Sequence, residues 1–247
     1  MCGRFANSSS DRDLVAAFAV AETVGDELPP SWNVAPTHQV RVVLDRLPRA
    51  SSTPDGGAPA APVRQLRTVR WGLVPSWAED VRIGARLINA RAESITDKPA
   101  FKAAAARRRC LVPADGYFEW EPRPGTRTKQ AWYLHRGEAL LAFAGLYELW
   151  PDPALDRHDP ARWVWSCSVL TTRAPDALGQ VHDRSPVLLT PELAADWLDP
   201  TLTDPARVRE ILEAVPEPLL EPTEVSDAVG NVRNDGPELV RPVRAEP

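Results

Sequence analysis

The order of apolar and polar residues along this chain changes its period several times, and each change predicts an element. Between Asp11 and Val20, apolar residues recur at helical spacing behind Ser10, a residue type suited to an N-cap, so a short helix is predicted. Runs of β-type residues predict strands over Val40 to Leu44 and over Val69 to Trp77, the second ending in a turn. Lys98 to Arg109 has a proline near its start and cations at its end, which suits the helix dipole and predicts a helix.

The second half of the chain is predicted to be mostly sheet. Four runs there are rich in β-type residues and separated by Gly, Pro and Arg: CLVPADGYFEW, AWYLHR, LLAFAGLYELW and VWSCSVLTT. Helices with proline in their first turn are predicted over 191–199 and 205–215, and a short strand ends the turn-rich tail. Strands interrupted by helices without regular alternation indicate an α+β fold. With no internal repeat in the sequence, we expect a single domain over residues 1–247.

One segment, Pro48 to Pro62, is rich in Pro, Gly, Ala and Ser and poor in large apolar residues. Such a composition cannot bury enough surface to order itself. We expect a flexible surface loop here, which need not mark a domain boundary.

Composition also predicts the class of binding partner and the cellular compartment. The sequence has no stretch of about 18 apolar residues and no basic-then-apolar start, so a soluble cytoplasmic protein without membrane contacts is expected. The formal net charge of −5 is unevenly distributed. Residues 1–150 hold 20 Lys and Arg against 16 Asp and Glu, whereas residues 151–247 hold 9 against 18. A polyanion is therefore expected to meet the first part of the chain.

The three cysteines, Cys2, Cys110 and Cys167, are widely spaced, with neither a C-x-x-C pair nor a nearby histidine cluster. Neither a disulfide framework nor a zinc site is expected, and no cofactor is indicated. Cys2 follows Met1 directly and is small enough for Met1 to be removed. The mature terminus would then combine an α-amine of pKa about 7.7–8.0 with a thiol of pKa about 8.5. This pair can close on an aldehyde as an imine and then a thiazolidine ring; alternatively, Cys2 is simply a small buried residue.

Two further stretches carry candidate chemistry. In LINARAES, Asn89 and Arg91 lie two apart, so on an extended segment they face the same way, with apolar neighbours on the other side. In ADGYFEW, Glu119 lies between Phe118 and Trp120, where desolvation would raise its pKa and fit it for proton transfer. The alternative for Glu119 is an exposed strand carboxylate.

Other candidates are single residues near turns. His182 comes just before an apolar strand and is either catalytic or a structural histidine. Asn33 lies in a turn before Pro36. Trp71 and Trp77 flank a proline-containing loop, and they either belong to the core or offer rings on which bases stack.

The chain resembles the SOS response-associated peptidase (SRAP) family. Seven motifs carry the resemblance, in this order and over most of the chain: MCGRF, WNVAPT, WGLVPSW, LINARAES, ADGYFEW, HDRSPVLL and AVGNVRN. The departures from the family pattern are the Pro48 to Pro62 insertion and the acidic last third, which argues against broad duplex binding.

The resemblance implies that the protein senses and shields abasic sites in single-stranded DNA. Cys2 would form a covalent thiazolidine with the ring-opened deoxyribose once Met1 is removed. Asn89 would hydrogen-bond near the sugar and the Cys2 amine, Glu119 would shuttle protons, and His182 would assist proton transfer and stabilise developing oxygen charge. The family fold implied is mixed α+β, with mainly antiparallel strands closing toward a barrel, flanking helices and a positively charged groove.

The DNA contacts implied by the resemblance are of two kinds. Arg4, Asn33 and Arg91 would contact phosphates and backbone, and Trp71, Trp77 and Trp120 would stack on flanking bases. A basic surface is also needed, and the candidates are four residues whose alternative role is a solvated helix end: Lys102, Arg107, Arg108 and Arg109.

Three other activities stay open. Cys2 could attack an acyl group with His182 as base, as in a thiol peptidase or amidohydrolase. The protein could instead bind single-stranded DNA without covalent chemistry. The imine also permits β-elimination of the 3′ phosphate, which would add a weak lyase activity. In each case we expect a monomer that works without metal or cofactor and joins the nucleoid when bound to DNA.

Overall fold

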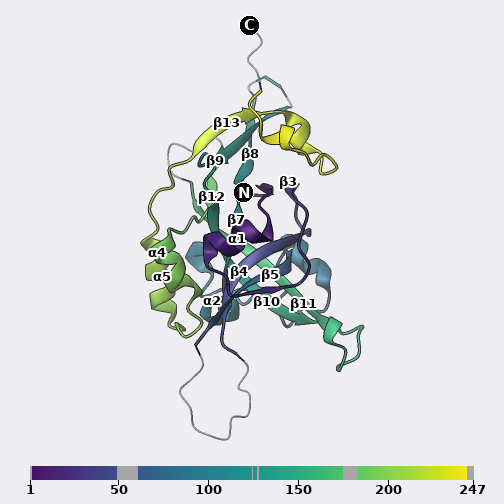
Figure 1. Cartoon of the computed structure of the whole chain (residues 1–247), viewed down its shortest axis with the longest axis vertical. Coiled ribbons are helices and arrows are strands. Elements are labelled where there is room, and N and C mark those ends of the chain that lie inside the picture. Colours follow the sequence, from purple (N-terminus) through teal and green to yellow (C-terminus); the bar gives the residue numbers. More distant parts are fainter. Residues whose placement is uncertain (1, 49–60, 124, 127, 175–182, 244–247) are drawn as a thin grey trace, which may run out of the picture.

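The computed structural model describes residues 2–48, 61–123, 125–126, 128–174 and 183–243. Most of the loop expected over Pro48 to Pro62 lies outside these residues, as does His182. The two described sheets and the helices around them are drawn in Figure 1.

The smaller sheet has five antiparallel strands and contains the N-terminal segment. Its order is β13 (Glu221–Val225), β9 (Lys129–His135), β8 (Gly116–Pro122), β1 (Phe5–Asn7) and β3 (Ser31–Val34). The register places Phe5 of β1 opposite Tyr117 of β8. The short strand β1 is thus held between β3 and β8, directly after Cys2.

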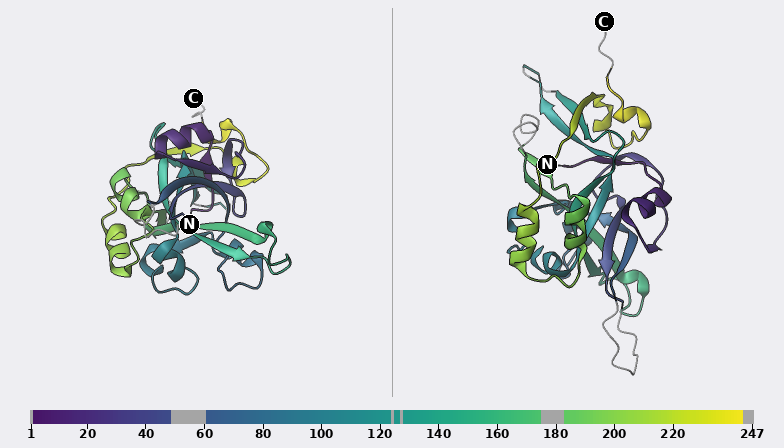
Figure 2. Two further views of the ribbon diagram at one scale, coloured as in Figure 1. Left: turned by 60° about the horizontal axis from the view of Figure 1, so that its bottom comes forward. Right: turned by 60° about the vertical axis from the view of Figure 1, so that its left-hand side comes forward.

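The larger sheet closes on itself. Its order is β12 (Arg184–Pro186), β11 (Trp163–Arg173), β10 (Leu141–Pro151), β7 (Arg109–Ala114), β4 (Gln39–Arg46), β5 (Val63–Trp71) and β2 (Glu22–Val24). A parallel pairing of β11 with β5, the strands next to the two ends of this order, closes β11, β10, β7, β4 and β5 into a five-stranded barrel. Closure leaves these five strands without a free edge. The left view of Figure 2 shows strands curving around the N-terminal end of the chain.

Within the described residues, four α-helices flank the sheets: α1 (Asp11–Phe18), α2 (Lys102–Arg107), α4 (Pro191–Leu198) and α5 (Pro205–Glu213). Helix α1 begins as predicted, because the Ser10 hydroxyl accepts from the backbone N–H of Asp13 and the Asp13 carboxylate accepts from the backbone N–H of Ser10. It ends two residues earlier than predicted, where Ala19 adopts a left-handed φ of 51°. Helices α4 and α5 carry proline in their first turn behind Thr190 and Asp204 caps. Short 3-10 turns cover 81–86, 92–94, 160–162, 227–230 and 237–240.

Two predicted elements depart further from their predicted bounds than the helix ends, which differ by one or two residues. The helix predicted over Lys98 to Arg109 is α-helical only over Lys102–Arg107, and Arg109 already opens β7. The guanidinium of Arg109 is buried and donates to the carbonyls of Ala105, Ala106, Trp197 and Asp199, which draws the chain out of the helix. The strand predicted over Val69 to Trp77 ends at Trp71.

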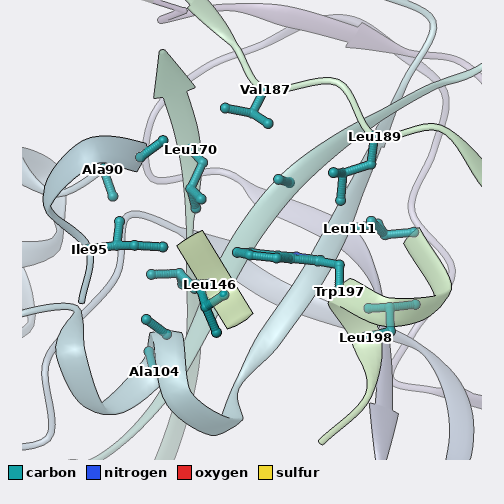
Figure 3. Packing of buried hydrophobic residues seen from close by; sticks show 14 of the residues in the cluster. Ala90, Ile95, Ala104, Leu111, Leu146, Leu170, Val187, Leu189, Trp197 and Leu198 are labelled. Carbon is teal, nitrogen blue, oxygen red and sulfur yellow. The ribbon is translucent and has the colours of Figure 1, made fainter. Parts of the chain in front are cut away.

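The barrel packs on both faces. Its interior cluster contains Cys2, Phe5, Trp71 and Phe143, and Phe5 meets the other two rings edge to face at 5.1 and 5.9 Å between centroids. A second cluster lies under α2, α4 and α5, with Trp197 at its centre (Figure 3). The α+β prediction is therefore confirmed, in a mainly antiparallel, barrel-containing form. No helix in the described part of the chain is long and apolar enough to cross a membrane.

Candidate functional site

Cys2 is completely buried at the interior of the barrel, just before β1. Its carbonyl oxygen accepts a hydrogen bond of 2.8 Å from Nδ2 of Asn89, and its Sγ lies 3.9 Å from the Arg4 carbonyl oxygen. Burial, and then the negative charge of Glu119, raise the pKa of the Cys2 thiol well above its usual value. At neutral pH this sulfur therefore carries its proton and needs a neighbouring base to react.

Asn89 contacts Cys2 from a strand that is hydrogen-bonded to β11 of the barrel. It opens the three-residue strand β6 (Asn89–Arg91), which pairs in parallel with β11 so that Asn89 lies opposite Val169. Ala90 is buried, whereas Asn89 is half-buried and Arg91 exposed, as the alternation of an extended segment predicts. The Oδ1 atom of Asn89 is buried and has no hydrogen-bond partner among the described residues. It can accept a hydrogen bond from an amine or a sugar hydroxyl at this position.

Glu119 of β8 is the carboxylate of the site. Burial, with a smaller contribution from the charge of Asp183, raises its pKa from 4.5 to about 7 against the opposing effects of the chain's amino terminus and Lys129. A carboxyl group with this pKa is poised to accept and to donate a proton near neutral pH. The predicted upward shift is confirmed.

The residues that desolvate Glu119 differ from those expected. Phe118 and Trp120 pack into a third cluster with Ala6 and Tyr133, on the other face of β8. Glu119 shares its face with Tyr117, because side chains two apart on a strand point the same way. Tyr117 lies in the barrel cluster with Cys2, and burial, followed by the charges of Cys2 and Glu119, raises the pKa of its hydroxyl. Desolvation comes from this interior side, where sequence reasoning missed Tyr117.

Arg4 and Asn33 form a clamp on the C-terminal segment. Arg4 donates through NH1 to Oδ1 of Asn33 at 2.7 Å and to the carbonyl of Val229 at 2.8 Å. Asn33 is buried, and its Nδ2 donates to the carbonyls of Val229, Asn231 and Asn234 at 3.1, 3.1 and 2.7 Å. The expected phosphate contact of Asn33 is therefore corrected, because its amide is already fully used inside the protein. This clamp also explains the AVGNVRN motif, to which sequence reasoning assigned no role.

The three tryptophans expected to stack on bases have different surroundings. Trp71 is completely buried in the barrel and donates from Nε1 to the carbonyl of Ile88 at 2.9 Å. A ring without an exposed face cannot stack on a base, so the expectation for Trp71 is corrected. Trp77 is 59% exposed, and Trp120 is half-buried.

Trp77 borders a surface hollow of about 450 Å³ beside the buried site. Asn89 and Arg91 line the same hollow, and Lys98 adds a second cation. An exposed ring and two cations thus lie next to the residue that holds Cys2. This combination suits a single nucleic-acid strand, whose bases stack and whose phosphates attract cations.

The basic surface expected around the end of α2 is smaller than predicted. Lys102 and Arg107 are exposed, but Arg108 pairs with the buried Glu148 at 2.7 Å. Arg109 is buried, which lowers its pKa to about 10, and its guanidinium is fully engaged with carbonyls. The expectation of a surface role for Arg109 is therefore corrected. His182 lies outside the described residues, and its role stays a prediction.

Comparison with known proteins places this geometry in a family. The sequence matches the family described as SOS response associated peptidase (SRAP) over residues 1–232. It is 35% identical over 242 residues to "Abasic site processing protein YoqW" of Bacillus subtilis (strain 168), with 97% of this chain and 99% of that protein covered. It is 31% identical over 251 residues to "Abasic site processing protein YedK" of Escherichia coli (strain K12), with 98% and 100% covered.

The fold agrees. A crystal structure of a protein from Bacteroides thetaiotaomicron superposes with a TM-score of 0.76 at 21% identity and covers 98% of this chain and 100% of that one. At this identity the likeness concerns the fold alone, and it extends over the barrel and the smaller sheet together. The sequence match over nearly the whole chain establishes the relationship independently: this protein belongs to the SRAP family.

Proposed function

We propose that this protein recognises abasic sites in single-stranded DNA and captures them covalently through Cys2 after Met1 is removed. The observation that carries the proposal is the meeting of Cys2, Asn89 and Glu119 in a buried site beside a hollow with an aromatic ring and cations. The names of the relatives, abasic site processing proteins, support the same lesion as substrate.

The chemistry assigned to Cys2 uses both of its nucleophiles. The α-amine adds to the aldehyde carbon of the ring-opened deoxyribose, and loss of one water gives an imine. The thiol sulfur then adds to the imine carbon, and the thiol proton ends on the ring nitrogen. The product is a five-membered thiazolidine, with water as the only leaving group.

Glu119 is assigned the proton transfers of this sequence. In its ionised form it accepts protons from the amine and the thiol; in its protonated form it donates to the departing hydroxyl. A pKa of about 7 keeps both forms populated at neutral pH. The raised pKa of the Cys2 thiol makes such a base necessary, because the sulfur arrives protonated.

Asn89 is assigned a positioning role. Its Nδ2 holds the carbonyl of Cys2, and its buried Oδ1 is free to receive a hydrogen bond from the Cys2 amine or from a hydroxyl of the sugar. Fixing the amine at the point where the aldehyde arrives lowers the entropic part of the barrier. Arg91, Lys98 and Trp77 are assigned to the DNA strand itself, as phosphate and stacking contacts.

The main rival is a thiol peptidase with Cys2 as nucleophile. Cysteine nucleophiles of that class have a lowered pKa in a cation-rich surrounding. Here burial and the charge of Glu119 raise the Cys2 pKa, which is the opposite of the lowered pKa typical of that class. A weak strand scission is a further part of the proposal, because an imine can eliminate the 3′ phosphate before the ring closes.

The test mixes protein shown by mass spectrometry to begin at Cys2 with a single-stranded oligonucleotide that carries one abasic site. The products are separated on a denaturing gel beside an intact oligonucleotide, a Cys2→Ala variant and a Cys2→Ser variant. We expect a shifted band only with native Cys2 and the abasic strand. Cys2→Ser retains the amine but cannot form the sulfur ring, so it should give a band only after borohydride reduction. If native protein gives no band, the capture proposal fails.

A further inference from the structure

A second hollow, of about 750 Å³, lies at the end of the barrel where β4 ends and β5 and β11 begin. Arg46, Arg67, Trp163 and Trp165 line it. Trp163 precedes Val169, the β11 residue opposite Asn89, by six positions, which is about 20 Å along a strand. The hairpin between β10 and β11 projects at the lower end of the molecule in Figure 1. This hollow is therefore separate from the Cys2 site.

Its centre is a stack of rings and guanidinium groups. Trp165 lies parallel to Tyr147, with 5.6 Å between ring centroids. On the ring of Trp165, the guanidinium carbon of Arg67 lies 3.8 Å and that of Arg46 5.2 Å from the centroid. The aromatic ring thus holds two cations in one small volume, where they repel each other, and the charge of Glu22 on the wall of the same hollow offsets part of this repulsion at Arg67.

Two buried polar atoms of residues that line this hollow have no hydrogen-bond partner among the described residues. Nε of Arg67 is buried without a hydrogen-bond acceptor among the described residues, and burial followed by the charge of Arg46 lowers the pKa of this guanidinium. Gln65 is only 8% exposed; its Nε2 donates to Glu22 at 2.7 Å, while its Oε1 is buried and has no donor among the described residues. Buried polar groups are normally hydrogen-bonded, so the wall of the hollow carries one unpaired donor and one unpaired acceptor among the described residues.

An exposed aromatic ring borders the same hollow. Trp163 is 47% exposed and lies two residues before Trp165, so both rings stand on one face of β11. The guanidinium of Arg162 lies 5.4 Å from the Trp163 ring centroid and adds a third cation. A flat ring beside paired guanidinium groups can hold a base and its phosphate together.

We propose that this hollow is a second binding site for single-stranded nucleic acid, with a phosphate held by Arg46 and Arg67 and a neighbouring base stacked on Trp163. The site is independent of the chemistry at Cys2. It would retain the protein on undamaged strand, so that abasic sites are met by a molecule already bound to DNA. An acidic peptide would use the two cations but would not need the ring of Trp163.

The experiment uses the full chain with Cys2→Ala, which removes covalent capture, and a fluorescently labelled oligo-dT without abasic sites. Affinity is measured by fluorescence anisotropy at several salt concentrations. We expect Trp163→Ala to weaken binding about tenfold. Arg46→Gln should weaken binding and reduce the salt slope by about 0.7, the contribution of one single-strand phosphate. The control is Arg207→Gln, which removes an exposed cation on α5 and should change only the general electrostatic attraction.

Thermal melts establish that each variant is folded before its affinity is interpreted. Binding by Trp163→Ala and Arg46→Gln equal to that of the control would overturn the proposal. A competition with a poly-Glu peptide gives a second way to overturn it. If the peptide displaces oligo-dT, and if Trp163→Ala binds the peptide as tightly as the parent does, the site recognises negative charge alone. In the protein with native Cys2, the final yield of abasic-site adduct at saturating DNA should be the same for Trp163→Ala and the parent. The adduct yield therefore tests the capture proposal, and the affinity for undamaged oligo-dT tests this second site separately.

Discussion

The side-chain amide of Asn89 donates to the carbonyl oxygen of Cys2 across 2.8 Å, although the two residues are 87 positions apart. The bond ties the start of the chain to β6, the strand that pairs with β11. It leaves the amine and the sulfur of Cys2 as the groups available for chemistry. The expectation was a bond near the amine; the observed bond goes to the carbonyl and so fixes the residue without occupying its nucleophile.

Replacing Asn89 by Ala should slow capture of an abasic oligonucleotide more than it affects stability. The lost hydrogen bond contributes about 1 kcal/mol to folding, whereas loss of a fixed amine position should reduce the capture rate at least about tenfold. Rates come from quenched time points on a denaturing gel, and stability from urea unfolding. An Asn89→Ala protein that captures as fast as the parent would remove Asn89 from the positioning role.

Glu119→Gln should remove the pH dependence of capture around neutrality. Because the pKa of Glu119 is about 7, the rate of the parent protein should change slope near pH 7, where the carboxyl passes from donor to acceptor. Glutamine has the same shape but no titrating proton, so the variant should be about 100-fold slower and lack that inflection. A rate profile measured from pH 5 to 9 tests this, since an unchanged inflection would belong to another group.

The same carboxyl group should make folding stability depend on pH. Its folded pKa of about 7 is above the usual 4.5, so the unfolded chain loses this proton at lower pH than the folded one. Its favourable contribution is complete below about pH 4.5 and is lost as the pH rises through 7. Glu119→Gln should therefore stabilise the protein relative to the parent at pH 8, by on the order of 3 kcal/mol, and much less at pH 5. Urea unfolding of both proteins at the two pH values measures the difference.

Trp71 and Trp77 occur in one motif, WGLVPSW, but their substitutions should affect different properties: DNA affinity for Trp77 and folding stability for Trp71. Trp77→Ala removes an exposed ring, so it should weaken binding of single-stranded DNA about fivefold to tenfold and change stability by less than about 0.5 kcal/mol. Trp71→Ala leaves a cavity in the barrel and removes one of the two hydrogen bonds to the Ile88 carbonyl, and should cost about 3–5 kcal/mol of stability. Thermal unfolding and anisotropy on each variant compare the two effects. The assignments fail if Trp71→Ala is as stable as Trp77→Ala.

Local signals in the sequence were sufficient for the elements that local interactions determine. Ser10 and Asp13 cap α1 within four residues, and the start of this helix was predicted correctly. The end of α2 could not be predicted, because Arg109 is satisfied by carbonyls that include those of Trp197 and Asp199, about ninety residues away. A run of three arginines indicates a cationic helix end unless such distant acceptors are known.

In the candidate site too, the sequence identified residues but did not identify their distant neighbours in space. The family motifs located Cys2, Asn89 and Glu119, and the raised pKa of Glu119 followed from the expectation of burial. The neighbours that bury it were misassigned, because apolar residues adjacent in sequence on a strand point to the opposite face. Asn33 was misassigned for a different reason: a motif places an amide in a turn but does not identify the three carbonyls, nearly two hundred residues later, that it binds.

Asn33→Ala should release the C-terminal segment that this clamp holds. The substitution leaves the carbonyls of Val229, Asn231 and Asn234 without their shared donor and Arg4 without one acceptor, which should lower the free energy of unfolding by about 2–3 kcal/mol. Asn231→Ala is the matched control, because among the described residues the Asn231 side chain accepts a hydrogen bond from the neighbouring Arg233 N–H and makes no other. Limited proteolysis should cut Asn33→Ala first within residues 227–243, well before the control. Since Arg4 lies two residues after Cys2, capture of abasic DNA should slow as well. Equal protease resistance of the two variants would mean that the segment is held by its own 3-10 turns and the β13 pairing, and that the clamp adds little.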